Sequence, residues 1–120
     1  MMGFTPAQRY YLGREPADMR KSYDGLSGLV RQGMGRDPLS GEVFIFLNRR
    51  RTMIKILVWD RSGFVIWSKR LERGTFELPR NTQAGASVPL SWEELVMILE
   101  GVRLSSVQRR KRYSRGAAAV

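Results

Sequence analysis

Residues 49–74 read RRRTMIKILVWDRSGFVIWSKRLERG, and this stretch decides the fold of the chain. Two strongly apolar segments, 53–59 and 64–70, flank the sequence DRSG at positions 60–63. Val, Ile, Phe and Trp favour extended structure, and DRSG is typical of a tight hairpin turn in which glycine takes the positive φ. The stretch therefore predicts a β-hairpin with basic residues at its outer ends.

The turn also sets a register for the two strands. With Trp59 opposite Phe64, one side of the sheet carries the pairs Trp59–Phe64, Leu57–Ile66 and Lys55–Ser68. The other side carries Ile54, Ile56, Val58, Val65 and Trp67. Because both sides are largely apolar, we expect central strands that are covered on both faces, or covered on one and used for contact on the other.

The residues before this hairpin predict a strand, a long helix and a second strand. Residues 9–12 favour extended structure and end at a glycine. The sequence EPAD at 15–18 is a helix start signal with Asp18 as the N-cap, and apolar residues every three or four positions then predict a helix over 19–34. The apolar run EVFIFL at 42–47 predicts a strand.

The residues after the hairpin predict a short strand over 75–78, stopped by a proline, and a polar loop over 80–87. The sequence SWEE at 91–94 is a capping box, in which Ser91 and Glu94 satisfy each other's backbone amides. The apolar face of the helix that follows consists of Leu95, Ile98, Leu99 and Val102, and Gly101 ends it.

These elements predict an α/β protein of the α+β type. We expect one compact domain over residues 1–104, with a mainly antiparallel sheet of about five strands, one long helix packed on it and a C-terminal helix. Residues 105–120 are predicted to form a basic, flexible tail, because 108–120 contain five basic residues and no acid.

Composition excludes several classes of site. The 120 residues include no cysteine, which excludes disulfides and thiolate metal sites, and no histidine, the commonest metal ligand and general base. We therefore predict no cofactor and no metal. No apolar run approaches the roughly 18 residues of a membrane span, and the N-terminus shows no secretory signal. The expected location is the cytoplasm.

Charge is the strongest compositional signal. Lys and Arg number 21 against 11 acids, which gives a net charge of +10 and an isoelectric point near 11.0. Residues 48–73 alone hold eight basic and two acidic residues, a local net charge of +6. Such a basic balance is typical of nucleic-acid binding. The alternative is a basic protein whose charge only maintains its solubility.

We predict DNA contact through the basic residues at the hairpin ends and in the tail, because the arginine fork suits phosphate geometry. The alternative is an ordinary solvated turn. The candidate nucleic-acid-binding residues are Arg49, Arg50, Arg51, Lys55, Lys69, Arg70, Arg73, Arg109, Arg110, Lys111 and Arg112.

Two other functions remain open at this stage. A protein-interaction module would dock on a partner or self-associate through apolar surface around Trp59, Phe64 and Trp67, although these aromatics are also typical of a core. A metal-dependent nuclease would need several converging carboxylates, and Asp60, the single candidate at a strand end, is explained by its hairpin turn. We therefore predict no enzymatic activity.

Three ordered motifs resemble a known family. ADMRKSYDGLSGLV at 17–30, the segment from DPLSGEVFIFL through LERGTFELP at 37–79, and VPLSWEELVMILEGV at 88–102 are similar to the second open reading frame of insertion-sequence-66-type transposable elements. This small accessory protein is often called TnpB, and it is distinct from the RNA-guided nuclease of that name. The resemblance covers roughly residues 3–104.

The resemblance implies a role in bacterial transposition beside a separate, larger transposase, with no catalytic residue and no cofactor. The transposase of the same element is the partner that the resemblance implies. DNA is expected as a partner from the basic charge, a second copy of the chain is a partner under the protein-interaction alternative, and no membrane partner is expected. The segments that match the family pattern, none with an assigned function, are 18–21, 55–57, 59–60 and 69–74.

Overall fold

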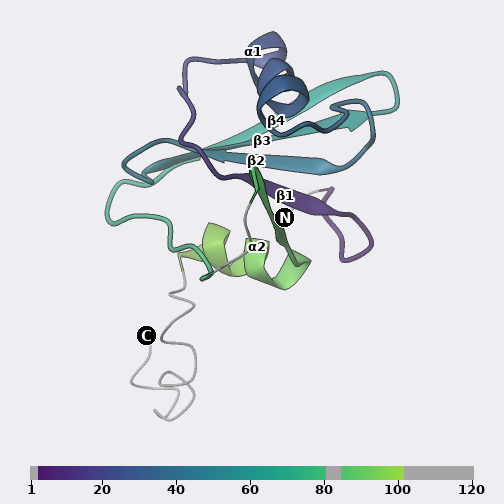
Figure 1. The fold of residues 1–120 in the computed structure, drawn as a ribbon. Coiled ribbons are helices and arrows are strands. Elements are labelled where there is room, and N and C mark those ends of the chain that lie inside the picture. Colours follow the sequence, from purple (N-terminus) through teal and green to yellow (C-terminus); the bar gives the residue numbers. More distant parts are fainter. Residues whose placement is uncertain (1–2, 81–84, 102–120) are drawn as a thin grey trace.

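The computed structural model describes residues 3–80 and 85–101 of the chain. Its strands are β1 (Tyr10–Gly13), β2 (Val43–Leu47), β3 (Met53–Asp60), β4 (Gly63–Arg70) and β5 (Ser87–Leu90). They form one sheet in the order β4-β3-β2-β1-β5 (Figure 1). Helix α1 (Tyr23–Gly28) lies on one side of the sheet and α2 (Trp92–Glu100) on the other. The predicted α+β class is therefore confirmed.

The predicted hairpin is confirmed together with its register. β3 and β4 pair antiparallel with Trp59 opposite Phe64, and Asp60 and Gly63 close a two-residue turn. The prediction that glycine takes the positive φ is wrong, because the left-handed residue of this turn is Arg61, with φ of 57°.

One prediction about the sheet is corrected and another is confirmed. β4 is an edge strand rather than a central one, because only β3 pairs with it among the described strands. The prediction of a mainly antiparallel sheet is confirmed, and the one parallel pair among the described strands joins β1 to β2 with Tyr10 opposite Val43. A parallel pair requires a long crossover connection, and residues 14–42, which contain α1, provide it.

The last strand of the sheet is also not the predicted one. Residues 75–78 form no strand, although Phe76 is fully buried and its backbone N–H donates to the carbonyl of Arg51 at 2.7 Å. The fifth strand is β5, which pairs antiparallel with β1 and includes Pro89. The sequence SVPL gave no strand signal, because proline demotes a short apolar run.

The first helix is shorter than predicted. α1 begins at Tyr23 and continues as a π-helical turn over Leu29–Gly33. Asp18 does not cap it; its carboxylate accepts hydrogen bonds from the backbone N–H of Arg20 at 2.9 Å and from the Arg20 guanidinium at 2.7 Å. This side-chain hydrogen bond holds the pKa of Asp18 well below its usual range. The N-cap position belongs to Ser22 instead.

The second helix follows its sequence signals. The Ser91 hydroxyl accepts from the backbone N–H of Glu94 at 3.0 Å, and the Glu94 carboxylate accepts from the backbone N–H of Ser91 at 2.9 Å. Gly101 ends the helix in the left-handed region, with φ of 79°. The predicted capping box and C-cap are thus confirmed, whereas Val102 lies outside the described residues.

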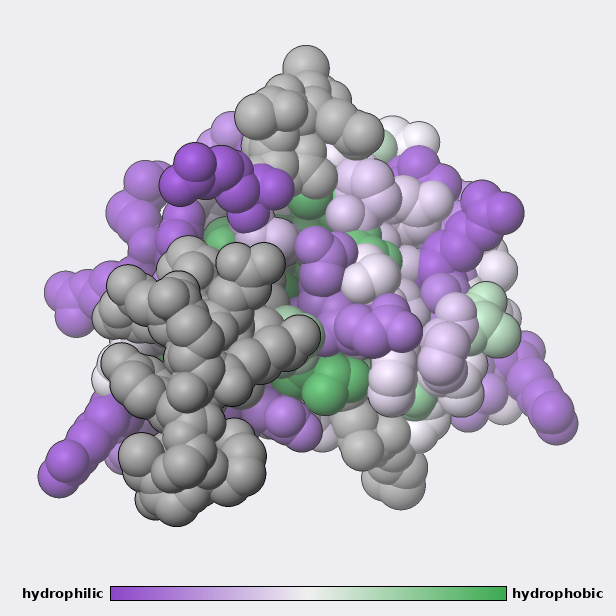
Figure 2. All heavy atoms as spheres, turned by 90° about the horizontal axis from the view of Figure 1, so that it is seen from below, coloured by the Kyte–Doolittle hydropathy of each residue, from purple (hydrophilic) through white to green (hydrophobic). Residues whose placement is uncertain are grey.

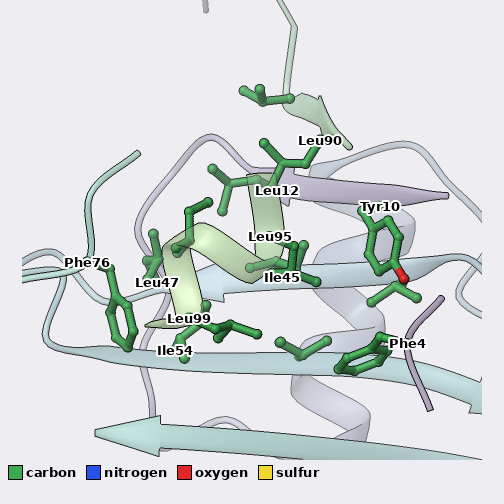
Figure 3. Packing of buried hydrophobic residues seen from close by; sticks show 14 residues of the cluster. Phe4, Tyr10, Leu12, Ile45, Leu47, Ile54, Phe76, Leu90, Leu95 and Leu99 are labelled. Atoms are coloured by element: carbon green, nitrogen blue, oxygen red, sulfur yellow. The ribbon is translucent and has the colours of Figure 1, made fainter. Parts of the chain in front are cut away.

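The sheet separates two hydrophobic clusters. On the α2 side, buried residues of β1, β2 and β3 meet Leu95 and Leu99, with Phe4 and Phe76 closing the cluster (Figure 3). On the α1 side, Phe44, Phe46 and Leu57 of the sheet meet Leu26 and Val30. β2 is buried on both faces, as expected of its continuous apolar sequence. No helix in the described part of the chain is both long and apolar enough to cross a membrane.

Candidate nucleic-acid interface

The turn between β2 and β3 carries three exposed arginines on a defined backbone. The Asn48 carboxamide oxygen accepts from the backbone N–H groups of Thr52 at 2.8 Å and Met53 at 3.0 Å. Arg51 takes the left-handed conformation with φ of 59°. The Asn48 side chain thus holds the backbone of this turn, and the side chains of Arg49, Arg50 and Arg51 are exposed.

The end of β4 lies beside this turn. Arg70 pairs with Met53 in the sheet, and the Leu71 N–H donates to the carbonyl of Thr52 at 2.8 Å. The chain then returns past Arg51, to which Phe76 is hydrogen-bonded. Arg70 and Arg73 are both exposed, so they share one end of the sheet with the arginine turn. The opposite end of the hairpin carries the Asp60–Gly63 turn.

The two lysines of the predicted set have other partners. The Lys69 ammonium donates to the carbonyl of Leu99 in the last turn of α2 at 2.7 Å, and is part-buried there. The Lys55 ammonium donates to the carbonyl of Lys21, which precedes α1, at 2.8 Å. These contacts lie on opposite faces of the sheet. The Lys55 contact joins the sheet to the segment before α1, and the Lys69 contact joins it to α2. A cation near a helix C-terminus is also favoured by the helix dipole.

The arginines of the 49–51 turn are not among the ion-paired arginines of the described residues. Within the described residues, ion pairs join Arg70 to Glu72 at 3.3 Å, Arg20 to Asp18 and Arg36 to Glu42. In the Arg70–Glu72 pair, 68% of the Arg70 side chain and 80% of the Glu72 side chain are exposed to solvent. Ion pairs as exposed as this one contribute little to stability. None of the three pairs involves an arginine of the 49–51 turn.

Arg36 shows the opposite situation. Its guanidinium lies 3.7 Å from the centre of the Tyr11 ring and donates to the Glu42 carboxylate at 3.2 Å, and these contacts raise its pKa, the hydrogen bond to Glu42 most of all. This arginine is part-buried and has its partners within the fold. The arginines of the turn instead face solvent.

One basic residue near this end was not predicted from the sequence. Arg14 follows β1 and lines a hollow of about 260 Å³ together with Arg49, Arg51 and one acidic residue, Glu15. A second hollow of about 320 Å³ is lined by Arg14 and Arg51 as well. The Arg14 Nε donates to the carbonyl of Gly85 at 2.5 Å, which orients the side chain. Because parallel strands end at the same edge, β1 and β2 bring Arg14 to the turn.

The remaining candidates divide into two groups. Arg109, Arg110, Lys111 and Arg112 lie outside the described residues. Trp59 packs edge-to-face on Phe64 with ring centres 5.1 Å apart, Phe64 also packs against the α1-side cluster, and Trp67 packs against the α2-side cluster. The aromatics therefore serve the fold, as half-buried residues. Asp60 is exposed at the end of β3.

A small α+β domain with one strongly basic end is the class of protein that these features define. The chain matches the IS66 Orf2 like protein family over residues 8–109, and it belongs to that family. The resemblance seen in the sequence motifs is thereby confirmed. This membership marks the protein as an accessory component of an insertion sequence.

Two curated relatives come from Sinorhizobium fredii (strain NBRC 101917 / NGR234), and both are described as uncharacterized. The protein y4jC is 31% identical over 110 residues, which cover 92% of this chain and 92% of the relative. The protein y4hO is 29% identical over 94 residues, or 78% of this chain and 80% of the relative. No solved structure matches the chain.

Proposed function

We propose that this protein is a non-catalytic accessory factor of insertion-sequence transposition that holds DNA electrostatically in the bacterial cytoplasm. The observation that carries the proposal is the arginine turn: Arg49, Arg50 and Arg51 project from a backbone that Asn48 holds, without a carboxylate partner among the described residues. Arg70 and Arg73 at the end of β4 and Arg14 after β1 extend the same basic surface.

The proposed contacts are with phosphate oxygens. Guanidinium groups donate two parallel hydrogen bonds to a phosphate, and each neutralised phosphate releases a counterion. With about five such contacts, binding weakens roughly 10²- to 10³-fold between 50 and 200 mM salt. Phosphate contacts position a protein without selecting a base sequence, so the surface fits element ends and random DNA alike.

The two lysines of the predicted set enter the proposal in a different role. Lys55 and Lys69 hold the layers of the fold together through backbone carbonyls, and their contribution to DNA binding is the charge alone. We therefore expect alanine at either position to reduce stability more than it reduces DNA affinity.

Residues 105–120 are proposed to act as a separate basic tail after the domain of residues 1–104. Arg109, Arg110, Lys111 and Arg112 add four charges that can reach phosphates beyond the turn. A chain ending at residue 104 is expected to keep its thermal unfolding transition and to show a shallower dependence of DNA affinity on salt. An unchanged salt dependence would remove the tail from the interface.

The direct test compares two triple variants with the same charge change. The site variant is Arg49→Ala, Arg50→Ala and Arg51→Asn; asparagine is chosen because it tolerates the left-handed backbone. The matched control, Arg9→Ala, Arg31→Ala and Arg61→Asn, removes three exposed arginines elsewhere and includes the other left-handed arginine, whose φ is 57°.

Fluorescence anisotropy with element-end and random duplexes at two salt concentrations measures the outcome. We expect the site variant to lose about tenfold or more in affinity and to show a salt slope reduced by about 2 to 3 units, because each lost contact reduces the slope by about 0.9. The control should change affinity by only a few fold. Equal losses in both variants would show that net charge, and not this surface, governs binding.

The competing proposal is a module that docks on the transposase of the same element. It is favoured by the half-buried aromatics of β3 and β4, which leave apolar surface at the sheet. Co-purification with the transposase separates the two functions: the site variant retains the transposase and loses DNA if the arginines serve DNA. Loss of the transposase with DNA binding intact would assign the arginine turn to a protein partner.

A further inference from the structure

Within the described residues, the middle of β4 carries neither the charge nor the proline that normally protects an edge strand. β4 contains eight residues, and the five from Phe64 to Ser68 include no charge and no proline. Only β3 pairs with it among the described strands. Exposed edges are usually short, charged, bulged or covered, because a free row of backbone groups recruits another strand.

The backbone groups that face this edge can be identified. The Leu71 N–H donates to the carbonyl of Thr52, and these residues continue the β3–β4 register. Bonding alternates along an antiparallel strand, so the odd-numbered residues of β4 bond to β3. The N–H and C=O groups of Phe64, Ile66 and Ser68 consequently point away from the sheet.

Apolar surface lies beside the same edge on the α2 side of the sheet. A hollow of about 480 Å³ is lined by Phe4, Val58, Val65 and Trp67, and a second of about 440 Å³ is lined by Trp67 and residues of α2. Val65 is 47% exposed. Hydrophobic atoms reach the surface on the side seen from below (Figure 2). A strand added to β4 would cover part of this surface.

We propose that the strand added to β4 is β4 of a second copy of this chain, paired antiparallel about a two-fold axis at Ile66. Such an axis stands perpendicular to the sheet and keeps equivalent faces on the same side. Centring it on Ile66 sets Val65 opposite Trp67 of the second copy, and Phe64 opposite Ser68 of the second copy. The apolar middle of the strand thereby meets itself.

The distribution of charge favours this arrangement. Lys69 and Arg70 occupy one end of β4, whereas the Asp60–Gly63 turn at the other end carries one acid, Asp60, and one base, Arg61, and so has no net charge. Antiparallel pairing brings Arg70 of each copy beside the Asp60–Gly63 turn of the other. A parallel arrangement would place the two Arg70 side chains together, which costs energy. Antiparallel pairing thus keeps the basic ends of the two strands apart, and it sets the uncharged residues Phe64 to Ser68 of one copy against those of the other.

The dimer has one consequence that rests on the proposed function. The arginine turn lies at the end of the sheet where β4 finishes, and antiparallel pairing points these ends in opposite directions. The dimer would therefore hold two separate DNA segments, one at each end. This is a geometric advantage for a factor that acts where two ends of an element meet.

The test measures the association of the full chain by sedimentation equilibrium over a range of concentrations, without DNA. Val65→Lys puts a charge into the proposed interface, and Leu39→Lys is its matched control, because both side chains are 47% exposed. Ser68→Pro removes an outward-facing donor, and its side chain is exposed. Circular dichroism establishes that each variant is folded.

We expect the wild-type protein to sediment at twice the chain mass of 13.8 kDa. Val65→Lys and Ser68→Pro should each raise the dimer dissociation constant by about tenfold or more, whereas Leu39→Lys should not change it. A wild-type monomer at every concentration, or a dimer that both folded edge variants preserve, would overturn the proposal. Because no DNA is present, either result leaves the arginine surface to its own test.

Discussion

The two edges of this sheet are built in contrasting ways. β5 has four residues, of which Val88 and Leu90 are buried, and it continues directly into the capped helix α2. β4 has eight residues, none of them fully buried, and it is held mainly by its hairpin with β3. One edge is therefore short and anchored in the core, and the other is long and pairs with no further strand among the described residues.

A proline completes the contrast. The Arg14 N–H donates to the carbonyl of Ala86 at 3.0 Å, which continues the β1–β5 ladder. By alternation, Pro89 occupies a position whose N–H would point outwards, so its missing donor breaks no bond within the sheet. The β5 edge therefore contains a proline that lacks an outward donor, whereas the β4 edge keeps its outward N–H groups. This difference is the basis for proposing that β4, and not β5, pairs with a further strand.

The largest expected effect concerns how firmly each edge is anchored. Leu90→Ala on β5 should reduce the free energy of unfolding by about 3 kcal/mol, because Leu90 is only 7% exposed. Val65→Ala on β4 should reduce it by less than about 1 kcal/mol, since its side chain is half exposed. Urea unfolding measures both. Similar losses would contradict the contrast between the two edges.

A smaller effect concerns Tyr10, which lies opposite Leu90 in the sheet. Burial raises the pKa of Tyr10 above 10.0, and its hydroxyl donates to the carbonyl of Thr5 at 2.6 Å. Tyr10→Phe should cost about 1 kcal/mol at neutral pH through the lost hydrogen bond. Tyr23→Phe, at an exposed position, is the control and should cost almost nothing.

The pH dependence of the same pair of variants sharpens the test. Since the folded pKa of Tyr10 lies above the unfolded one, its contribution is complete below about pH 10 and declines as the pH rises through the folded pKa. Tyr10→Phe should therefore lose less stability than the wild type between pH 9 and pH 11, as followed by urea midpoints. Parallel curves would show that Tyr10 does not control this region.

The smallest effect tests the proline directly. Pro89→Ser restores an outward donor on β5 and should change the free energy of unfolding by less than about 0.5 kcal/mol. Association measured by sedimentation should stay at the wild-type level, because four residues offer too short an edge. If Pro89→Ser drives further association, proline rather than length is what protects β5.

The features predicted correctly from the sequence are local ones. The register of the β3–β4 hairpin follows from a two-residue turn, and the capping of α2 follows from Ser91 and Glu94, which are three residues apart. Each of these depends on neighbours within a few positions, which the order of residues reveals directly. The family resemblance was likewise found from contiguous motifs.

The errors and omissions concern contacts between distant segments. Nothing local distinguishes β4 as an edge, and the parallel pairing of β1 with β2 depends on a crossover of nearly 30 residues. β5 was not predicted because it contains Pro89. Proline is excluded from central strands, but an edge strand such as β5 tolerates it. Asp18 is a residue type typical of a helix N-cap, yet its carboxylate accepts a hydrogen bond from the Arg20 guanidinium instead.

The candidate site was predicted only in part for the same reason. The clustering of arginines in the 49–51 turn is visible in the sequence, and the hairpin brings Arg70 and Arg73 to it. Lys55 and Lys69 look equivalent in sequence, but their ammonium groups bond to carbonyls 34 and 30 residues away. Arg14 was missed because it reaches the turn only through the β1–β2 pairing.

The order of residues by itself determined the α+β class, the hairpin and its register, the C-terminal helix and the concentration of positive charge, because each depends on neighbouring residues or on composition. The tertiary structure decided which strand forms an edge, which basic side chains remain exposed and which are bonded internally. Strand order and side-chain partners result from packing between segments far apart in the chain. The free energy of that packing depends on several segments together and cannot be deduced from any one of them.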